Sequence, residues 1–81
     1  MWYLYILKCA DETLYVGITT DLTKRLKTHN QGKASRYTRM RLPVELVYQE
    51  EQPDKSSARK REIQIKNWSR DKKLALIQKS K

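Results

Sequence analysis

Residues 2–20 read WYLYILKCADETLYVGITT, and this stretch decides the fold. Aromatic and branched side chains fill residues 2–8 and 13–20, and a polar break at residues 10–12 separates the two runs. Aromatic and β-branched residues are enriched in strands. Two such runs around a short polar break predict a β-hairpin.

The two faces of this hairpin differ in chemistry, because successive side chains of a strand point to opposite faces. The apolar face comprises Leu4, Ile6, Leu14, Val16 and Ile18, and the other face comprises Tyr3, Tyr5, Tyr15, Gly17 and Thr19. A short turn predicts a register that pairs Tyr5 with Gly17 and sets Tyr15 diagonal to Tyr5. Phenol hydroxyls beside a glycine can position a phosphate or an attacking water close to the backbone. Alternatively, the tyrosines simply form a half-buried sheet face.

A helix and a basic segment are expected directly after the hairpin. Asp21 is a suitable N-cap for a helix over 22–30. Residues 33–42 carry basic side chains, no acid and little periodicity, which predicts a basic loop or an irregular turn. Pro43 closes that segment.

One more strand and two more helices complete the predicted fold. Alternation over 44–49 predicts a third strand, with one face made of Val44, Leu46 and Tyr48. Apolar stripes predict helices over 55–67 and 70–79, with Ser69 as the cap between them. The predicted class is α/β, with a small three-stranded, mainly antiparallel sheet flanked by helices in the order β-β-α-β-α-α.

Length and composition indicate one small domain, which we expect to span residues 1–81. The chain has 18 Lys and Arg against 9 Asp and Glu, which gives a net charge of +9 at pH 7. A surface this basic favours a polyanionic partner. The sequence has one cysteine, Cys9, and one histidine, His29. These counts exclude an intrachain disulfide and a structural zinc site.

No membrane segment is expected from the sequence. The longest apolar run covers residues 1–7, whereas a transmembrane helix needs roughly 18–20 residues. The run also lacks the basic start and the small-residue cleavage site of a secretory signal. We therefore expect a cytoplasmic protein with no membrane partner.

Two side chains of the first helix depart from the usual amphipathic pattern. Arg25 and His29 are interleaved with Leu22 and Leu26 at helical spacing, so both project from the face that turns toward the sheet. A cation in that place needs an anion. Alternatively, Arg25 extends around the edge of the core and His29 caps the end of the helix.

Glu62 is the only acid in residues 55–70, and it lies beside the apolar stripe of its helix. It can form an ion pair with Lys66, four residues further on. It can also hold Mg²⁺, because that ion binds one or two protein carboxylates together with waters and substrate phosphate oxygens. Both interpretations stay open at this point.

Basic side chains form two clusters that suit a phosphate backbone. The first lies within residues 22–44, which contain no acid, and the second lies within residues 59–73. The candidate nucleic-acid contacts are Lys24, Lys27, Lys33, Arg36, Arg39, Arg41, Lys66, Arg70 and Lys72. Charge runs are often only solvated faces, so these clusters indicate where a nucleic acid would lie and nothing about chemistry.

Nearly the whole chain resembles the GIY-YIG nuclease family, and more closely its small stand-alone bacterial members. The segment Tyr3-Leu4-Tyr5 resembles the first half of the name motif, and Tyr15-Val16-Gly17 resembles the second. Three further positions follow in the order of the family, namely Arg25, His29 and Glu62. The chain departs from the family pattern at Tyr3, where the name has glycine, and at Ile18, where some members have lysine.

The resemblance implies a role for each of these side chains. Tyr5 and Tyr15 would bind and orient the attacking water, and either Tyr15 or His29 would be the general base. Arg25 would hold the scissile phosphate, and Glu62 would bind a divalent metal, Mg²⁺ or Mn²⁺. An ordinary pKa of about 6.5 favours His29 as the base, with Tyr15 orienting the water.

We therefore expect a metal-dependent nuclease that hydrolyses phosphodiester bonds of nucleic acid, DNA rather than RNA, with low sequence specificity. The alternative is a module on the same scaffold that binds nucleic acid without cleaving it and works beside a protein partner. A third hypothesis is a small RNA-binding protein that does not use the tyrosine face.

Overall fold

The computed structural model describes residues 1–80, so Lys81, the last residue of the predicted domain, lies outside the described residues. Within the described part, the elements are β1 (Trp2–Lys8), β2 (Leu14–Thr19), α1 (Leu22–Asn30), α2 (Arg36–Arg39), β3 (Glu45–Gln52), α3 (Lys55–Lys66) and α4 (Arg70–Lys79). This confirms the predicted α/β class with an antiparallel three-stranded sheet flanked by helices. The short helix α2 is the one element that the sequence does not predict.

β1 is the central strand of the sheet, whose order is β2-β1-β3. Both neighbouring strands run antiparallel to β1, and the register with β2 pairs Tyr5 with Gly17 as predicted. The pairing with β3 shifts at one place, where Ile6 pairs with Tyr48 but the next residue of β1 pairs with Leu46. Val47 is therefore an extra residue in a β-bulge.

The bulge shows that the predicted face of the third strand was wrong. Leu46 packs on the tyrosine face of the sheet, whereas Val47 and Tyr48 pack against the core of the opposite face. An extra residue in a strand reverses the alternation of the side chains that follow it. The strand also continues beyond its predicted end to Gln52.

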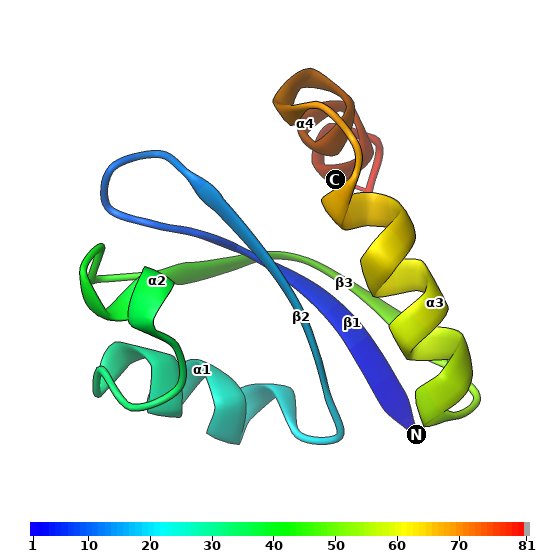
Figure 1. Cartoon of the computed structure of the whole chain (residues 1–81), viewed down its shortest axis with the longest axis horizontal. Coiled ribbons are helices and arrows are strands. Elements are labelled where there is room, and N and C mark those ends of the chain that lie inside the picture. Colours follow the sequence, from blue (N-terminus) through cyan, green and yellow to red (C-terminus); the bar gives the residue numbers. More distant parts are fainter. Residues whose placement is uncertain (81) are drawn as a thin grey trace.

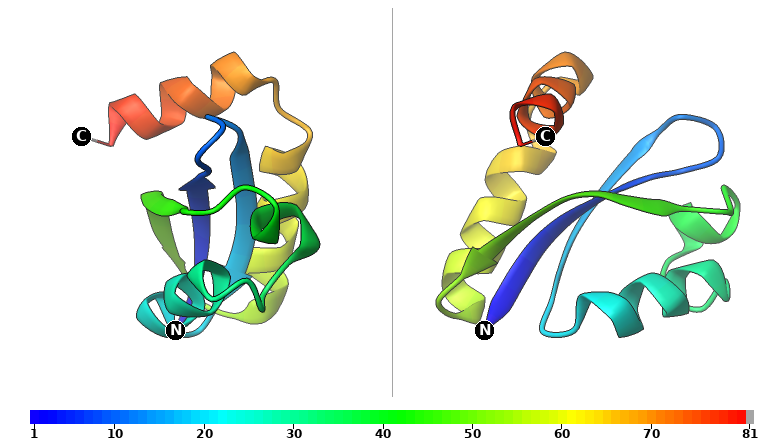
Figure 2. Two further views of the ribbon diagram at one scale, coloured as in Figure 1. Left: turned by 90° about the vertical axis from the view of Figure 1, so that its left-hand side faces the viewer. Right: turned by 180° about the vertical axis from the view of Figure 1, so that it is seen from behind.

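Helices cover both faces of the sheet (Figure 1), and each face has its own core. On the side of α3 and α4, the core consists of Leu4, Ile6, Val16, Ile65 and Ile77. On the side of α1 and α2, the core consists of Tyr5, Leu7, Cys9 and Val44, with Leu22 and Leu26 packed against it. Figure 2 shows the same layers from the side and from behind. The tyrosines thus belong to the layer that α1 and α2 cover.

The helix α2 corrects the prediction of a loop over residues 33–42. Ser35 is its N-cap, because the Ser35 hydroxyl accepts a hydrogen bond of 3.1 Å from the N–H of Tyr37. A helix of one turn is too short to produce a periodic pattern, so the sequence does not reveal it. None of the helices in the described part of the chain has the length and apolar character that crossing a bilayer requires.

Two isoleucines of α3 provide a matched test of the core. We expect Ile65→Ala to lower the free energy of unfolding by about 2–5 kcal/mol, because the substitution leaves a cavity. Ile65 is 0% exposed, whereas Ile63 is 51% exposed. Ile63→Ala should therefore change the free energy of unfolding by less than about 0.5 kcal/mol. Urea unfolding followed by circular dichroism measures both, and equal losses would contradict this placement of the core.

Candidate active site

The contact between Tyr5 and Gly17 forms the centre of the candidate site. A Cβ atom at residue 17 would lie 2.5 Å from the hydroxyl oxygen of Tyr5 and 2.6 Å from its Cζ. The ring therefore occupies the space that any other side chain at this position would need. As a result, the Tyr5 hydroxyl lies directly against the backbone of the edge strand β2.

A chain of hydrogen bonds leads from Tyr5 into the layer of α1 and α2. The Tyr5 hydroxyl lies 2.9 Å from Nε2 of His29, and Nδ1 of His29 lies 2.8 Å from Oγ1 of Thr38. Thr38 in turn donates to the carbonyl oxygen of Ser35 at 3.3 Å. His29 is 1% exposed and Thr38 is 0% exposed. Both ring nitrogens of the histidine are therefore occupied and shielded from water.

Burial sets the protonation states of Tyr5 and His29. Burial raises the pKa of Tyr5 above its ordinary value, and the neighbouring Tyr15 raises it further. Burial also lowers the pKa of His29, and the positive charge of Arg25 adds to this effect. Because burial disfavours the charged form of either group, the pair consists of a neutral phenol and a neutral imidazole at pH 7.

Aromatic rings hold Tyr15 in place. Its ring centroid lies 5.1 Å from that of His29 and 6.1 Å from that of Tyr37. The guanidinium of Arg41 lies 3.9 Å from the centroid of the Tyr37 ring and donates to the Tyr37 carbonyl oxygen. Within residues 1–80, the hydroxyl of Tyr15 has no hydrogen-bond partner, so it is available to a ligand.

Arg25 brings a positive charge to the site from α1. It is close enough to Tyr5 to lower the pKa of that phenol, against the larger effect of burial. The side chain is exposed, and no carboxylate of the described residues forms an ion pair with it. The anion that this cation needs is therefore not supplied by the described part of the chain.

Glu62 brings a negative charge from α3. It is 8% exposed, and its carboxylate lies 3.3 Å from Nζ of Lys66 and 3.8 Å from Nε of Arg59. The pairing with Lys66 that the spacing allows is thus present. Glu62 is also close enough to contribute to the raised pKa of Tyr5. Arg61 donates to Glu50 of β3 at 2.7 Å, which ties this part of α3 to the sheet.

The donor set fits a divalent metal only as part of a shell shared with substrate. Among the described residues, no group of three or more His, Cys, Asp or Glu side chains is placed to hold a metal ion. Mg²⁺ is commonly bound through one or two carboxylates, with waters and substrate phosphates as the other ligands. The buried carboxylate of Glu62 suits that arrangement, in which the metal binds together with a phosphate.

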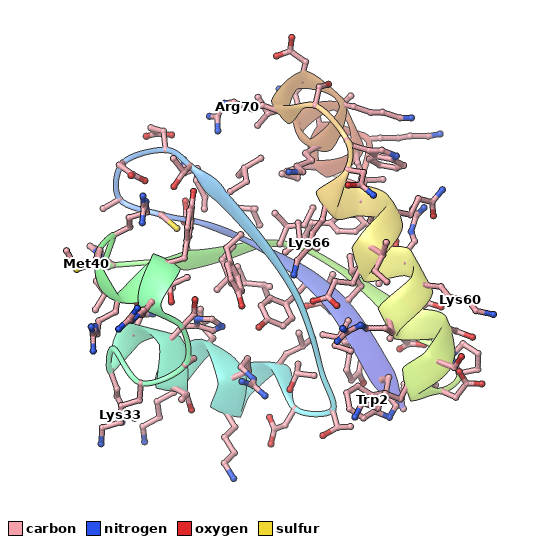
Figure 3. The ribbon with its side chains drawn as sticks, in the orientation of Figure 1. Trp2, Lys33, Met40, Lys60, Lys66 and Arg70 are labelled. Atoms are coloured by element: carbon pink, nitrogen blue, oxygen red, sulfur yellow. The ribbon has the colours of Figure 1, made fainter. Side chains whose placement is uncertain are left out.

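Predicted basic residues flank the site at both ends of β2. Lys24 and Arg25 line an open cavity of about 430 Å³ at the start of α1, together with residues 19–21. Lys66 extends from the end of α3 toward β2 (Figure 3) and lines a second hollow with Tyr15 and Tyr37. Because residues 14–16 line the second hollow, Gly17 lies between the two along the strand.

The other predicted nucleic-acid contacts are not gathered around Tyr5 and Tyr15. Arg41 packs on Tyr37 and lies 3.0 Å from the carboxylate of Asp11, so it is engaged within the protein. Nζ of Lys72 lies 4.4 Å from the centroid of the Trp68 ring. The remaining candidates are exposed on α1, α2, α4 and the loop before α2, namely Lys27, Lys33, Arg36, Arg39 and Arg70.

Sequence reasoning missed two residues that the structure brings to the site. Tyr37 lines the second hollow, together with Lys73 of the predicted second basic cluster, and an aromatic residue within a basic run was a usable signal for Tyr37. Thr38 gave no signal, because it belongs to a segment without periodicity. Its importance depends on a hydrogen bond to His29 that only the fold creates.

The fold and the site together define a class of protein. It is a small α/β domain in which Tyr5 lies against a glycine of the edge strand, Tyr15 and Arg25 lie near Tyr5, and a later helix adds Glu62. The sequence model described as the GIY-YIG catalytic domain matches residues 1–75. The chain therefore belongs to the GIY-YIG domain family.

Similar proteins share this family and fold. The UPF0213 protein SSP2268 of Staphylococcus saprophyticus is 53% identical over 75 residues, which cover 93% of this chain and 92% of that protein. A UPF0213 protein of Bacillus pumilus is 53% identical over 76 residues, which cover 94% of this chain and 78% of that protein. The solution NMR structure of the UPF0213 protein BH0048 from Bacillus halodurans matches with a TM-score of 0.61 and 43% identity, covering 96% of this chain and 84% of that chain. These names state no activity.

A double-mutant cycle tests the contact at the centre of the site. We expect Gly17→Ala to displace the Tyr5 ring and to lower the free energy of unfolding by about 1–3 kcal/mol, because the new methyl group overpacks the site. In a Tyr5→Leu background, the same substitution should have a much smaller effect, since the atoms it meets are gone. Unfolding in urea measures all four proteins, and strictly additive losses would contradict the contact.

The buried histidine predicts a pH dependence of stability. Because the pKa of His29 is lowered in the folded protein, the unfolded chain binds the proton more readily. The contribution of His29 is complete above the unfolded pKa of about 6.5 and falls as the pH drops toward the folded pKa. We therefore expect the stability difference between wild type and His29→Gln to decrease as the pH falls from about 7.5 to about 5. A constant difference, measured by urea unfolding, would contradict the burial of a neutral imidazole.

Proposed function

We propose that this protein is a metal-dependent nuclease that hydrolyses phosphodiester bonds of nucleic acid, with DNA as the expected substrate and low sequence specificity. The observation that carries this proposal is the hydrogen-bonded pair of Tyr5 and His29, beside an Arg25 that forms no ion pair within residues 1–80. Membership of the GIY-YIG domain family supports the reaction class. The net charge of +9 supports a nucleic-acid substrate.

Tyr5 is the group that we assign to activate the water. The raised pKa of Tyr5 makes the phenol a weak acid, so it does not act as a preformed phenolate. When its oxygen accepts a proton from water, it can pass its own proton to Nε2 of His29, which lies 2.9 Å away. The lowered pKa of His29 keeps this acceptor neutral at pH 7.

This assignment revises the expectation that His29 takes the proton from water directly. Both nitrogens of the imidazole already have partners, Thr38 at Nδ1 and Tyr5 at Nε2. A proton therefore reaches His29 through Tyr5. Tyr15 keeps the orienting role, because its hydroxyl has no hydrogen-bond partner within residues 1–80.

Charge stabilisation in the proposed reaction comes from Arg25 and Glu62. The guanidinium of Arg25 is exposed beside Tyr5 and would bind the phosphate, whose negative charge grows as the water attacks. Glu62 would hold Mg²⁺ or Mn²⁺, and such a metal supplies positive charge to the phosphate and the leaving oxygen. The cavities at the two ends of β2 would hold the nucleic acid on either side of the scissile bond.

A cleavage assay with a matched pair of carboxylate variants tests the proposal. The substrates are labelled single-stranded, duplex and branched DNA, and RNA, at low salt with Mg²⁺ or Mn²⁺. We expect cleavage by the wild type, and we expect Glu62→Gln to lower kcat by a factor of about 10²–10³. Glu51→Gln is the control, because Glu51 is an exposed carboxylate of β3. This control should retain wild-type activity. Adding a metal chelator should abolish cleavage by the wild type.

The same assay shows which outcomes contradict the proposal. Equal activity of Glu62→Gln and the wild type would remove Glu62 from the mechanism. Tight binding to every substrate without cleavage, with either metal, would contradict the nuclease proposal and favour a module that binds nucleic acid beside a catalytic partner.

A further inference from the structure

We propose that Thr38 is a positioning residue for the reaction, because its hydroxyl fixes the tautomer of His29 and so keeps Nε2 free to accept the proton of Tyr5. The catalytic consequence rests on the proposed nuclease function. The tautomer itself follows from the hydrogen bonds and does not depend on that function.

The direction of each hydrogen bond follows from the number of protons available. The hydroxyl of Thr38 has one proton, and the Ser35 carbonyl oxygen, 3.3 Å away, can only accept it. With that proton on the Ser35 carbonyl, Oγ1 of Thr38 accepts from Nδ1 of His29 at 2.8 Å. A neutral imidazole with a proton on Nδ1 has none on Nε2. Nε2 thus accepts from the hydroxyl of Tyr5 at 2.9 Å.

Reversing the hydrogen bond between Thr38 and His29 leaves the buried hydroxyl proton of Tyr5 without a partner in the described residues. If Thr38 donated to Nδ1, the proton of His29 would be on Nε2 and would point at the Tyr5 oxygen. The proton of Tyr5 would then have no acceptor among the side chains and backbone of residues 1–80. Tyr5 is 3% exposed, and buried polar groups in folded proteins are nearly always hydrogen-bonded. Satisfying every proton from within the described residues therefore selects the tautomer with hydrogen on Nδ1.

The tautomer decides whether Tyr5 can release its proton. With Nε2 unprotonated, the phenol donates to His29, and the lone pairs of its oxygen remain available to the water. With Nε2 protonated, the histidine would donate to the phenol oxygen and could not accept from it. Thr38 therefore acts on the reaction through His29 and Tyr5, at a distance from the substrate.

The helix α2 holds both tyrosines through consecutive residues. Thr38 contacts His29, which holds Tyr5, and Tyr37 stacks on Tyr15. The cap at Ser35 supports this turn and also supplies the carbonyl that orients the Thr38 hydroxyl. The segment that reads as a basic loop in the sequence thus forms the support of the tyrosine face.

A nuclear magnetic resonance experiment tests the tautomer directly. His29 is the only histidine in the chain, so a long-range ¹H–¹⁵N correlation spectrum of the ¹⁵N-labelled protein shows one imidazole. At a pH of about 7.5, where the ring is neutral, we expect a protonated Nδ1 and an unprotonated Nε2 in the wild type and in Thr38→Ser. Thr38→Val keeps the side-chain volume and removes the hydroxyl. In this variant we expect the imidazole proton of His29 to move from Nδ1 to Nε2. A protonated Nε2 in the wild type, or an unchanged tautomer in Thr38→Val, would overturn the inference.

Kinetics of the same variants test the consequence for the reaction. We expect Thr38→Val to lower kcat on the order of 100-fold with less than about a twofold change in KM, because the group does not touch substrate. Thr38→Ser should restore activity to within about threefold of the wild type. Thr23→Val is the matched control, since Thr23 is exposed on α1. A wild-type kcat in Thr38→Val would overturn the positioning role.

The two experiments separate the two proposals. If the wild type cleaves no substrate, the proposed function fails, and the tautomer spectrum still decides the hydrogen-bond assignment. If the wild type cleaves but its spectrum shows a proton on Nε2, the positioning role of Thr38 and the proton relay from Tyr5 to His29 both fail, and the proposed nuclease activity stands.

Discussion

The ring of Tyr5 rests on the bare backbone of Gly17, and the rest of the site depends on this contact. It requires the register that pairs these two residues across β1 and β2. It also holds the phenol oxygen within hydrogen-bond distance of His29. A shift of one residue in the hairpin would turn Tyr5 to the opposite face. The hydrophobic alternation that stabilises the sheet and the position of the Tyr5 phenol are therefore set by the same pairing.

The sheet separates two kinds of interior. Under α3 and α4 it buries aliphatic side chains, and under α1 and α2 it buries a layer that also holds the paired Tyr5 and His29. Burial does two things in the second layer. It stabilises the fold, and it keeps the phenol and the imidazole neutral by shifting their pKa values in opposite directions. A charged acid or base would be destabilised by burial in this place, and for this reason the proposed mechanism uses a proton relay between neutral groups.

The sequence was sufficient to predict the features that depend on a local pattern of residues. The hairpin, the position of Gly17, the helix over residues 22–30 and the cap at Ser69 each follow from alternation, periodicity or capping chemistry. The order of the motif residues also identified the family. The features that the sequence did not predict depend on contacts between segments that are distant along the chain. α2 is one turn long, and the hydrogen bond of Thr38 joins segments that no local pattern relates.

The bulge at Val47 lets one strand contribute to both interiors. Residues before it pack beneath α1, and residues after it pack beneath α3 and α4. A deletion or insertion of one residue between Pro43 and Tyr48 would exchange these two sets of side chains, even if every chemical type were kept. During evolution, this stretch is therefore expected to accept many substitutions while its length stays constant. Homologues with the same two cores are therefore expected to keep the spacing between Pro43 and Tyr48, and this spacing can be checked in their sequences.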